Sequence, residues 1–211
     1  MNLITSLFLG FATAFIGITP PGLLNMTAAK VNLKEGKRSA TWFVSGAVFI
    51  IFFQAYLAVL FSHYIADRPD ILILLREAGF GVFTLLTIYF LWIAKKPKIK
   101  KGKIKKYSST KRFFLGMLLS GLNFFPIPYY VFVSVTLSSY SLFSYTMTYI
   151  FVFVTGVVIG SSLVFYCYIT FFQKIQNKTD YIIKNMNTII GSITGLIALV
   201  TLINIIRYYL R

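Results

Sequence analysis

The sequence predicts an all-α integral membrane protein of six transmembrane helices, arranged as a 3+3 inverted repeat with broken first and fourth helices. Three features predict this fold: the apolar composition, the spacing of the apolar stretches, and the positions of the prolines. The 211 residues are 57% hydrophobic and only 12% charged. A soluble domain carries about twice that charged share. We therefore expect lipid, and not water, around most of the chain.

Apolar stretches long enough to cross a bilayer recur along the whole chain. A helical crossing needs about 20 mostly apolar residues. The stretches that meet this requirement are 3–29, 41–61, 71–94, 113–136, 144–172 and 187–208. They predict a single membrane domain over 1–211, with a first three-helix half (1–95), a Lys-rich cytoplasmic loop (96–112) and a second three-helix half (113–211).

Basic residues are concentrated in the loops that follow the first, third and fifth spans. Elsewhere the sequence has only Arg68, Arg76, Arg207 and Arg211. The positive-inside rule then places these three loops in the cytoplasm and both termini outside. We expect the segment Lys95–Arg112 to contact anionic lipid headgroups. Topology and lipid contact account for the net charge of +16 without a nucleic-acid partner.

Clustered prolines interrupt the first and fourth spans. Residues 19–22 read Thr-Pro-Pro-Gly, and residues 123–128 read Asn-Phe-Phe-Pro-Ile-Pro. Proline lacks an N–H and clashes with the carbonyl four residues earlier. The carbonyls expected to lose their helical partners are those of Ile16, Gly17, Leu122 and Phe124. Counted from the flanking basic residues, the breaks lie roughly 12–15 Å and roughly 16–21 Å from the cytoplasmic face, near the midplane.

A broken helix presents two opposite electrostatic ends near the middle of the membrane. The N-terminal end of a half-helix attracts an anion, and freed carbonyls attract a cation. A zwitterionic amino acid has one group for each end, so we expect such a small molecule as the cargo. The residues expected to bind it are Thr19, Pro20, Pro21, Gly22, Asn25, Gln54, Asn123, Pro126 and Pro128.

On these residues the chain resembles the LysE/RhtB family of amino-acid exporters. The resemblance rests on the proline–glycine break at 19–22, the basic stretch Lys30–Arg38, the Tyr-Phe-Leu element at 89–91 and the asparagine–proline region of the fourth span. It covers essentially the whole length. It implies a LysE-type translocator in the cytoplasmic membrane of a bacterium, which exports amino acids or similar small metabolites and is driven by the proton gradient.

The chain departs from that family's pattern in three places. The family usually reads Thr-Pro-Gly-Pro at the first break, and it usually has an adjacent asparagine and proline where Asn123 and Pro126 are separated here. Many members carry an acidic residue early in the second span, whereas this chain has Gln54 after four apolar residues. The missing acid argues against a cationic cargo such as lysine and leaves proton coupling without a carrier in that span.

Other functional classes find little support in the sequence. One histidine and one cysteine cannot form a metal cluster, so we expect no metal and no cofactor. The sequence shows no nucleophile–base pair, which argues against an enzyme. Membrane electron carriers of a similar three-plus-three plan need a cysteine pair, and Cys167 is alone. A non-transporting membrane subunit and a transporter of a different small solute remain as alternatives.

Two further expectations concern an acidic residue and the glycines. Glu77 is the only acid expected in or near a span, where an interfacial ion pair with Arg76 is predicted. The segments Gly156–Gly160 and Gly191–Gly195 match the small-residue pattern of close helix approach. We expect them to pack the fifth and sixth spans within one protomer, although the same pattern also allows a homodimer.

Overall fold

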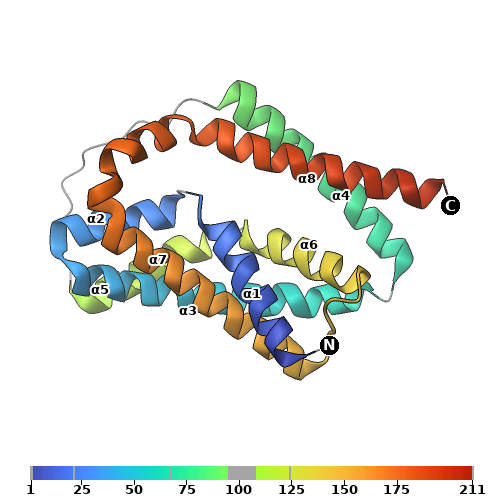
Figure 1. Cartoon of the computed structure of the whole chain (residues 1–211), viewed down its shortest axis with the longest axis horizontal. Coiled ribbons are helices and arrows are strands. Elements are labelled where there is room, and N and C mark those ends of the chain that lie inside the picture. The colour runs from blue at the N-terminus through green and yellow to red at the C-terminus, as the bar shows by residue number, and fades with distance from the viewer. Residues whose placement is uncertain (1, 21, 67, 95–107, 124, 211) are drawn as a thin grey trace. The chain divides into compact units, whose positions relative to one another are not determined.

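The computed structural model describes residues 2–20, 22–66, 68–94, 108–123 and 125–210, and every regular element among them is helical. The order along the chain is α1 (Leu3–Ile18), α2 (Leu23–Glu35), α3 (Lys37–Ala66), α4 (Pro69–Ile88), the π-helical turn η1 (Tyr89–Ile93), α5 (Ser109–Gly121), α6 (Pro126–Ser139), α7 (Met147–Lys184) and α8 (Met186–Tyr209). The predicted all-α class is therefore confirmed (Figure 1).

Within the described residues, two single helices have the length and hydropathy of a membrane span. They are the parts of α3 and α7 over Lys37–Ile65 and Met147–Phe171. Two bent pairs pass the same test if each pair counts as one span: α1 with α2, bent by 77°, and α5 with α6, bent by 60°. The apolar helices Gly79–Ile93 and Thr194–Tyr209 are shorter. The structure thus supports two to four candidate spans, and six spans stay a prediction.

Helices continue into two segments that were predicted as loops. Helix α7 runs through the expected fifth loop to Lys184, and only Asn185 separates it from α8. Helix α5 starts at Ser109, whose preceding residue Ser108 accepts a hydrogen bond from the Lys111 amide as an N-cap. The last residues of the predicted basic loop are therefore helical. Its residues 95–107 lie outside the described part.

The chain divides into two compact units. The first contains α1, α2, α3 as far as Tyr64, α5, α6 and α7 as far as Gln176. Its core combines small and aromatic side chains, among them Ala47, Ala55, Tyr130 and Phe153, which are all buried. The second unit contains α4, η1 and α8.

Glycines bring helices of the first unit into backbone contact at two crossings. Where α1 crosses α7, a Cβ on Gly10 would lie 2.0 Å from the Phe153 carbonyl oxygen, and a Cβ on Gly156 would lie 2.1 Å from that of Leu7. No side chain fits at such distances, so only glycine allows this approach. A Cβ on Gly160 would also come within 2.5 Å of a carbonyl oxygen of α1.

The second crossing joins α3 and α5 in the same manner. A Cβ on Gly116 would lie 1.9 Å from the Phe43 carbonyl oxygen, and a Cβ on Gly46 would lie 2.0 Å from that of Phe113. The spacing repeats that of the first crossing, since each glycine follows the carbonyl residue on its own helix by the same number of positions. Each half of the chain therefore supplies one helix to each glycine crossing.

In the second unit, α4 and α8 lie side by side along their length (Figure 1). At one end the Asn187 amide donates to the Ala94 carbonyl over 2.8 Å, and at the other the Tyr209 hydroxyl donates to Glu77 Oε1 over 2.7 Å. The sequence did not suggest Tyr209 as a partner of Glu77. The side chain of Arg76, the expected partner, lies outside the described part.

The glycine segments pack within the chain, but not as expected. Gly156 and Gly160 face α1, whereas Gly191 faces Leu91 of η1 and Gly195 faces the methyl group of Thr87 on α4. The Thr87 hydroxyl also donates to that of Thr194 over 3.0 Å. The prediction that these glycines pack the fifth span against the sixth is therefore wrong about their partners.

Candidate functional site

The first break separates α1 from α2, and a side-chain amide holds the carbonyls that it frees. Asn25, in the first turn of α2, is buried and reaches back across the break. Its Nδ2 donates to the Ile18 carbonyl and to the Pro20 carbonyl, the latter over 3.0 Å. One amide nitrogen thus uses both of its hydrogens on the interrupted backbone.

The second break separates α5 from α6, and the side-chain amide of Gln54 on α3 donates to backbone carbonyls beside it. Its Nε2 donates to the Ser120 carbonyl over 3.1 Å and to the Asn123 carbonyl over 2.9 Å. A backbone carbonyl without a partner in hydrocarbon costs several kcal/mol. Each of these two side chains therefore donates to two backbone carbonyls beside a break, of which the Ser120 carbonyl also accepts from the Asn123 amide over 3.0 Å.

The carbonyls that accept from the two amides are not those that proline geometry singled out. Proline geometry alone pointed to Ile16 and Gly17 at the first break, but the side-chain amide takes the carbonyl of Ile18 and that of Pro20 itself. The chain also bends at both breaks, which redirects the backbone groups after the last helical turn. Of the two carbonyls predicted at the second break, Phe124 lies outside the described residues.

Tyr129 connects the second break to the helix that leads into the first. It lies in the first turn of α6, and its hydroxyl donates to the Thr13 carbonyl of α1 over 2.9 Å. Its ring lies against Gly17, where a Cβ would come within 2.7 Å of a ring carbon. Tyr168 of α7 adds a contact at the first break, since its hydroxyl donates to the Thr19 carbonyl over 2.7 Å.

The half-helices that start at the two breaks differ in their free amides. Gly22 caps α2 without a side-chain hydrogen bond, and the following residues Leu23, Leu24 and Asn25 all carry an N–H. In α6 the equivalent turn begins with Pro126 and includes a second proline, so it offers fewer amides. The N-terminal end of α2 is therefore the better anion site of the two.

Two buried polar atoms beside the second break have no hydrogen-bond partner among the described residues. They are Gln54 Oε1 and Ser120 Oγ, which belong to side chains that are 6% and 0% exposed. Buried polar atoms are nearly always paired in folded proteins. An acceptor and a hydroxyl left in this position can together receive a donor such as an ammonium group.

The structure places the remaining predicted site residues around the breaks. Thr19 and Gly22 are exposed, Pro126 is half-buried and Pro128 is exposed. Pro21 lies outside the described residues. The Thr19 hydroxyl donates to the Phe15 carbonyl of its own helix, so its hydrogen is already used at the end of α1.

Three residues at the site were not predicted from the sequence: Ser120, Tyr129 and Tyr168. With 14 tyrosines in the chain, aromatic character alone does not single out Tyr129 or Tyr168. Tyr129 directly follows a proline of the second break, and this position was the only available signal. Tyr168 lies far along the chain from Thr19, so no local pattern links the two.

A buried ion pair links α2 to α5 at the ends of these helices that lie away from the breaks. The Arg112 Nε donates to Glu35 Oε2 over 2.8 Å, a second guanidinium nitrogen donates to Glu35 Oε1, and both side chains are 2% exposed. Arg112, the last residue of the predicted basic loop, is therefore buried in the protein, and the acid that it binds is Glu35.

Helices broken by prolines, with carbonyls held by buried amides, define a helical membrane protein built like a transporter. The chain belongs to the LysE type translocator family, whose match covers residues 15–205 and includes both breaks. It is thus a multi-pass membrane transporter of that family, which is not a family of enzymes. No curated protein and no solved structure that was compared with the chain matches it.

Proposed function

We propose that the protein exports amino acids or similar small zwitterionic metabolites across the cytoplasmic membrane, by proton-coupled secondary transport. In this proposal the cargo binds near the midplane between the two broken helices. The observation that carries it is the pairing of Asn25 and Gln54 with the breaks. Each of these buried amides donates to two backbone carbonyls beside a proline break.

The two ends of a zwitterion have different places in this arrangement. The carboxylate is assigned to the N-terminal turn of α2, which keeps its amides, because helix N-termini favour anions. The ammonium group is assigned to the second break, where Gln54 Oε1 and Ser120 Oγ have no partner in the described structure. Tyr129 lies between the two places, because it follows the second break and contacts α1 just before the first.

The matching glycine crossings support an inverted repeat of three helices in each half. Gly10 precedes Pro20 by the same number of residues as Gly116 precedes Pro126. Each glycine packs a broken helix against a long helix of the other half. Two halves with equivalent contacts can exchange roles, which is how many secondary transporters open to alternate sides of the membrane.

Proton coupling needs a group that can gain and lose a proton on the transport path. Among the side chains that the structure describes, no acid contacts the carbonyls of the breaks, and the buried carboxylate of Glu35 is held by Arg112. We therefore base proton coupling on the family resemblance alone, and we assign it to no residue of this chain.

The experiment is to express the protein in bacteria, load the cells with a panel of dipeptides and follow the release of free amino acids. We expect faster release of particular amino acids, and loss of that release when Pro20 and Pro21 are both replaced by alanine. Pro69→Ala is the matched control, because Pro69 starts α4 without interrupting a helix. Full transport by the double variant would contradict a site at the break.

A second arm separates the proposed function from its alternatives. In proteoliposomes, N-acetylated amino acids lack the ammonium group and amino-acid amides lack the carboxylate, so neither should compete with the cargo. Competition by either compound would contradict the zwitterion assignment. If no amino acid moves although the protein is in the membrane, a different solute or a non-transporting subunit becomes the better explanation.

A further inference from the structure

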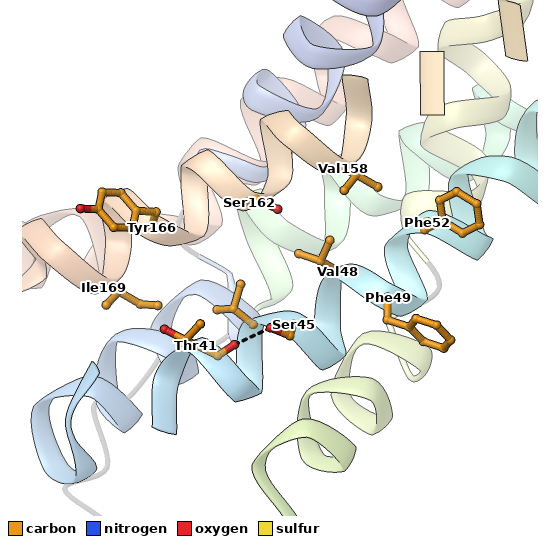
Figure 2. Close-up of a pocket in the computed structure, with 10 residues that line it drawn as sticks. Thr41, Ser45, Val48, Phe49, Phe52, Val158, Ser162, Tyr166 and Ile169 are labelled. Atoms are coloured by element: carbon orange, nitrogen blue, oxygen red, sulfur yellow. Dashed lines mark hydrogen bonds between the residues drawn. The ribbon is translucent and has the colours of Figure 1, made fainter. Parts of the chain in front are cut away.

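An open groove of about 530 Å³ runs between α3 and α7, apart from both helix breaks (Figure 2). On α3 its walls include Thr41, Ser45, Val48 and Phe52, and on α7 they include Val158 and Tyr166. These two helices each have the length and hydropathy of a membrane span. The groove therefore lies at the depth of lipid acyl chains.

Two hydroxyls line the α3 wall of the groove, and neither has a hydrogen left to donate, although their oxygens can still accept. The Thr41 hydroxyl donates to the Lys37 carbonyl over 3.0 Å, and the Ser45 hydroxyl donates to the Thr41 carbonyl over 2.9 Å, as Figure 2 shows for the second bond. Both hydroxyl hydrogens are thus used within α3. None of the described residues that line the groove is charged. A charged cargo would therefore meet only hydroxyl groups here, at a cost in desolvation, whereas a hydrocarbon chain needs no polar partner.

One end of the groove carries positive charge. Lys37 begins α3 one helical turn before Thr41, so the two residues share a face of the helix. The Lys37 ammonium lies 4.8 Å from the centroid of the Tyr166 ring, and this contact holds it at the groove. Arg38, the next residue, is exposed as well. The volume is within the usual range of about 300–1,000 Å³ for small-molecule sites.

We propose that this groove is a binding site for one anionic phospholipid. An acyl chain occupies the apolar groove, and the phosphate binds to Lys37 and Arg38. An apolar groove that ends at two cations fits such a lipid better than a zwitterionic one. The phosphate of a zwitterionic lipid is already compensated by that lipid's own ammonium group, whereas the phosphate of an anionic lipid has no counter-charge of its own. The site is separate from the proposed cargo site and does not depend on what the protein transports.

The test measures lipid binding to the purified full-length protein by native mass spectrometry in detergent. The probes are palmitoyl-oleoyl phosphatidylglycerol and the phosphatidylcholine with the same chains. We expect preferential binding of phosphatidylglycerol. The variant Lys37→Gln/Arg38→Gln should lose that preference by roughly fivefold for each cation removed. The matched control, Arg68→Gln/Arg207→Gln, removes the same charge at exposed positions outside the groove and should keep it.

A second pair of variants tests the groove itself. Ser45→Trp places a large ring in the groove and should weaken binding of both lipids, whereas Leu57→Trp adds a ring at an exposed position of α3 that does not line it. Each variant is first checked for a single peak in size-exclusion chromatography, and Val158→Trp replaces Ser45→Trp if the latter does not fold. Val158 lines the groove from α7, so a large ring there should weaken binding of both lipids in the same way.

Three results would overturn the proposal. They are equal binding of the two lipids by the wild-type protein, equal loss of preference in the two charge variants, and equal binding by Ser45→Trp and Leu57→Trp. Soluble glycerol phosphate serves as a further probe. If it displaces phosphatidylglycerol at comparable concentration, the cations alone account for binding and the acyl chain has no site.

Discussion

Arg112 binds the carboxylate of Glu35 through two guanidinium nitrogens, and so joins the last residue of α2 to the first turn of α5. Both charges lie at unfavourable helix ends, since a carboxylate is disfavoured at a C-terminus and a cation at an N-terminus. Each helix end therefore depends on the other for its compensation. The pair fixes the half-helix that follows the first break to the half-helix that precedes the second.

Removing one member of this pair should destabilise the protein strongly. Glu35→Gln leaves the guanidinium of Arg112 buried without its counter-charge, and such a loss costs about 3–5 kcal/mol. We expect a clear fall in the apparent melting temperature, measured by size-exclusion chromatography of heated samples. Glu77→Gln is the matched control, because Glu77 is an exposed acid.

The swapped variant Glu35→Arg/Arg112→Glu should recover much of that loss. It restores opposite charges and places each at the helix end that favours its sign. A melting temperature for Glu35→Gln equal to that of the wild type would show that the pair is not buried. Failure of the swap alone would show that the geometry of the guanidinium, and not charge, is what matters.

Asn25 should be needed for transport, since its amide holds two carbonyls at the first break. Asn25→Leu leaves both buried acceptors without a donor, at about 1–3 kcal/mol for each, and we expect export to fall at least about tenfold by the arithmetic of such energies. The measurement is the dipeptide-loaded export assay, normalised to the amount of protein in the membrane.

Asn32→Leu provides the matched control for that prediction. Asn32 lies on the same helix, and its amide donates to the Ile169 carbonyl of α7 over 2.7 Å, away from the break. The control variant should lose stability but retain export. If the two variants lose export equally, the loss reflects weakened packing of α2 and not the break.

The breaks could be predicted from the sequence because proline acts locally. Its missing N–H and fixed ring interrupt a helix wherever it stands, so 19–22 and 123–128 were identified without any knowledge of the fold. Asn25 and Gln54 were expected at the site because polar side chains are rare and costly at that depth. The structure places each of them on carbonyls beside a break.

Contacts between distant parts of the chain could not be predicted in this way. Arg112 ends a run of basic residues as its single arginine, but nothing in the sequence links it to Glu35. Its burial depends on α5 starting at Ser109 and on Glu35 ending a helix that is longer than expected. The partners of the glycine segments were wrong for the same reason, since small residues indicate close approach but not the helix that approaches.

The hydrogen bond between Tyr209 and Glu77 should respond to alkaline pH. The carboxylate of Glu77 accepts from the neutral phenol and raises the pKa of Tyr209. A group whose pKa is raised on folding stabilises the protein below its ordinary pKa, and that contribution is lost as the pH rises through the raised value. The link between α4 and α8 should therefore weaken above the ordinary tyrosine range, near pH 10.

An ultraviolet titration of the wild type, from which that of Tyr209→Phe is subtracted, isolates this residue among the other tyrosines. We expect its transition above that of a free tyrosine, and a return towards the ordinary value in Glu77→Gln. An identical transition with and without Glu77 would show that the two side chains do not interact in the folded protein.

The two glycine crossings should respond alike to an added methyl group. In Gly10→Ala the new Cβ would lie 2.0 Å from the Phe153 carbonyl oxygen, and in Gly116→Ala it would lie 1.9 Å from that of Phe43. Overpacking of this kind costs about 1–3 kcal/mol or more.

Gly79→Ala is the control for the two crossings, because nothing lies within 4 Å of the added atom. The better helix propensity of alanine should stabilise α4 by up to about 1 kcal/mol. The melting temperatures of the three variants, compared with that of the wild type, measure these changes in stability. Similar losses for Gly10 and Gly116 would support equivalent crossings in the two halves, whereas loss at only one of them would argue against an inverted repeat.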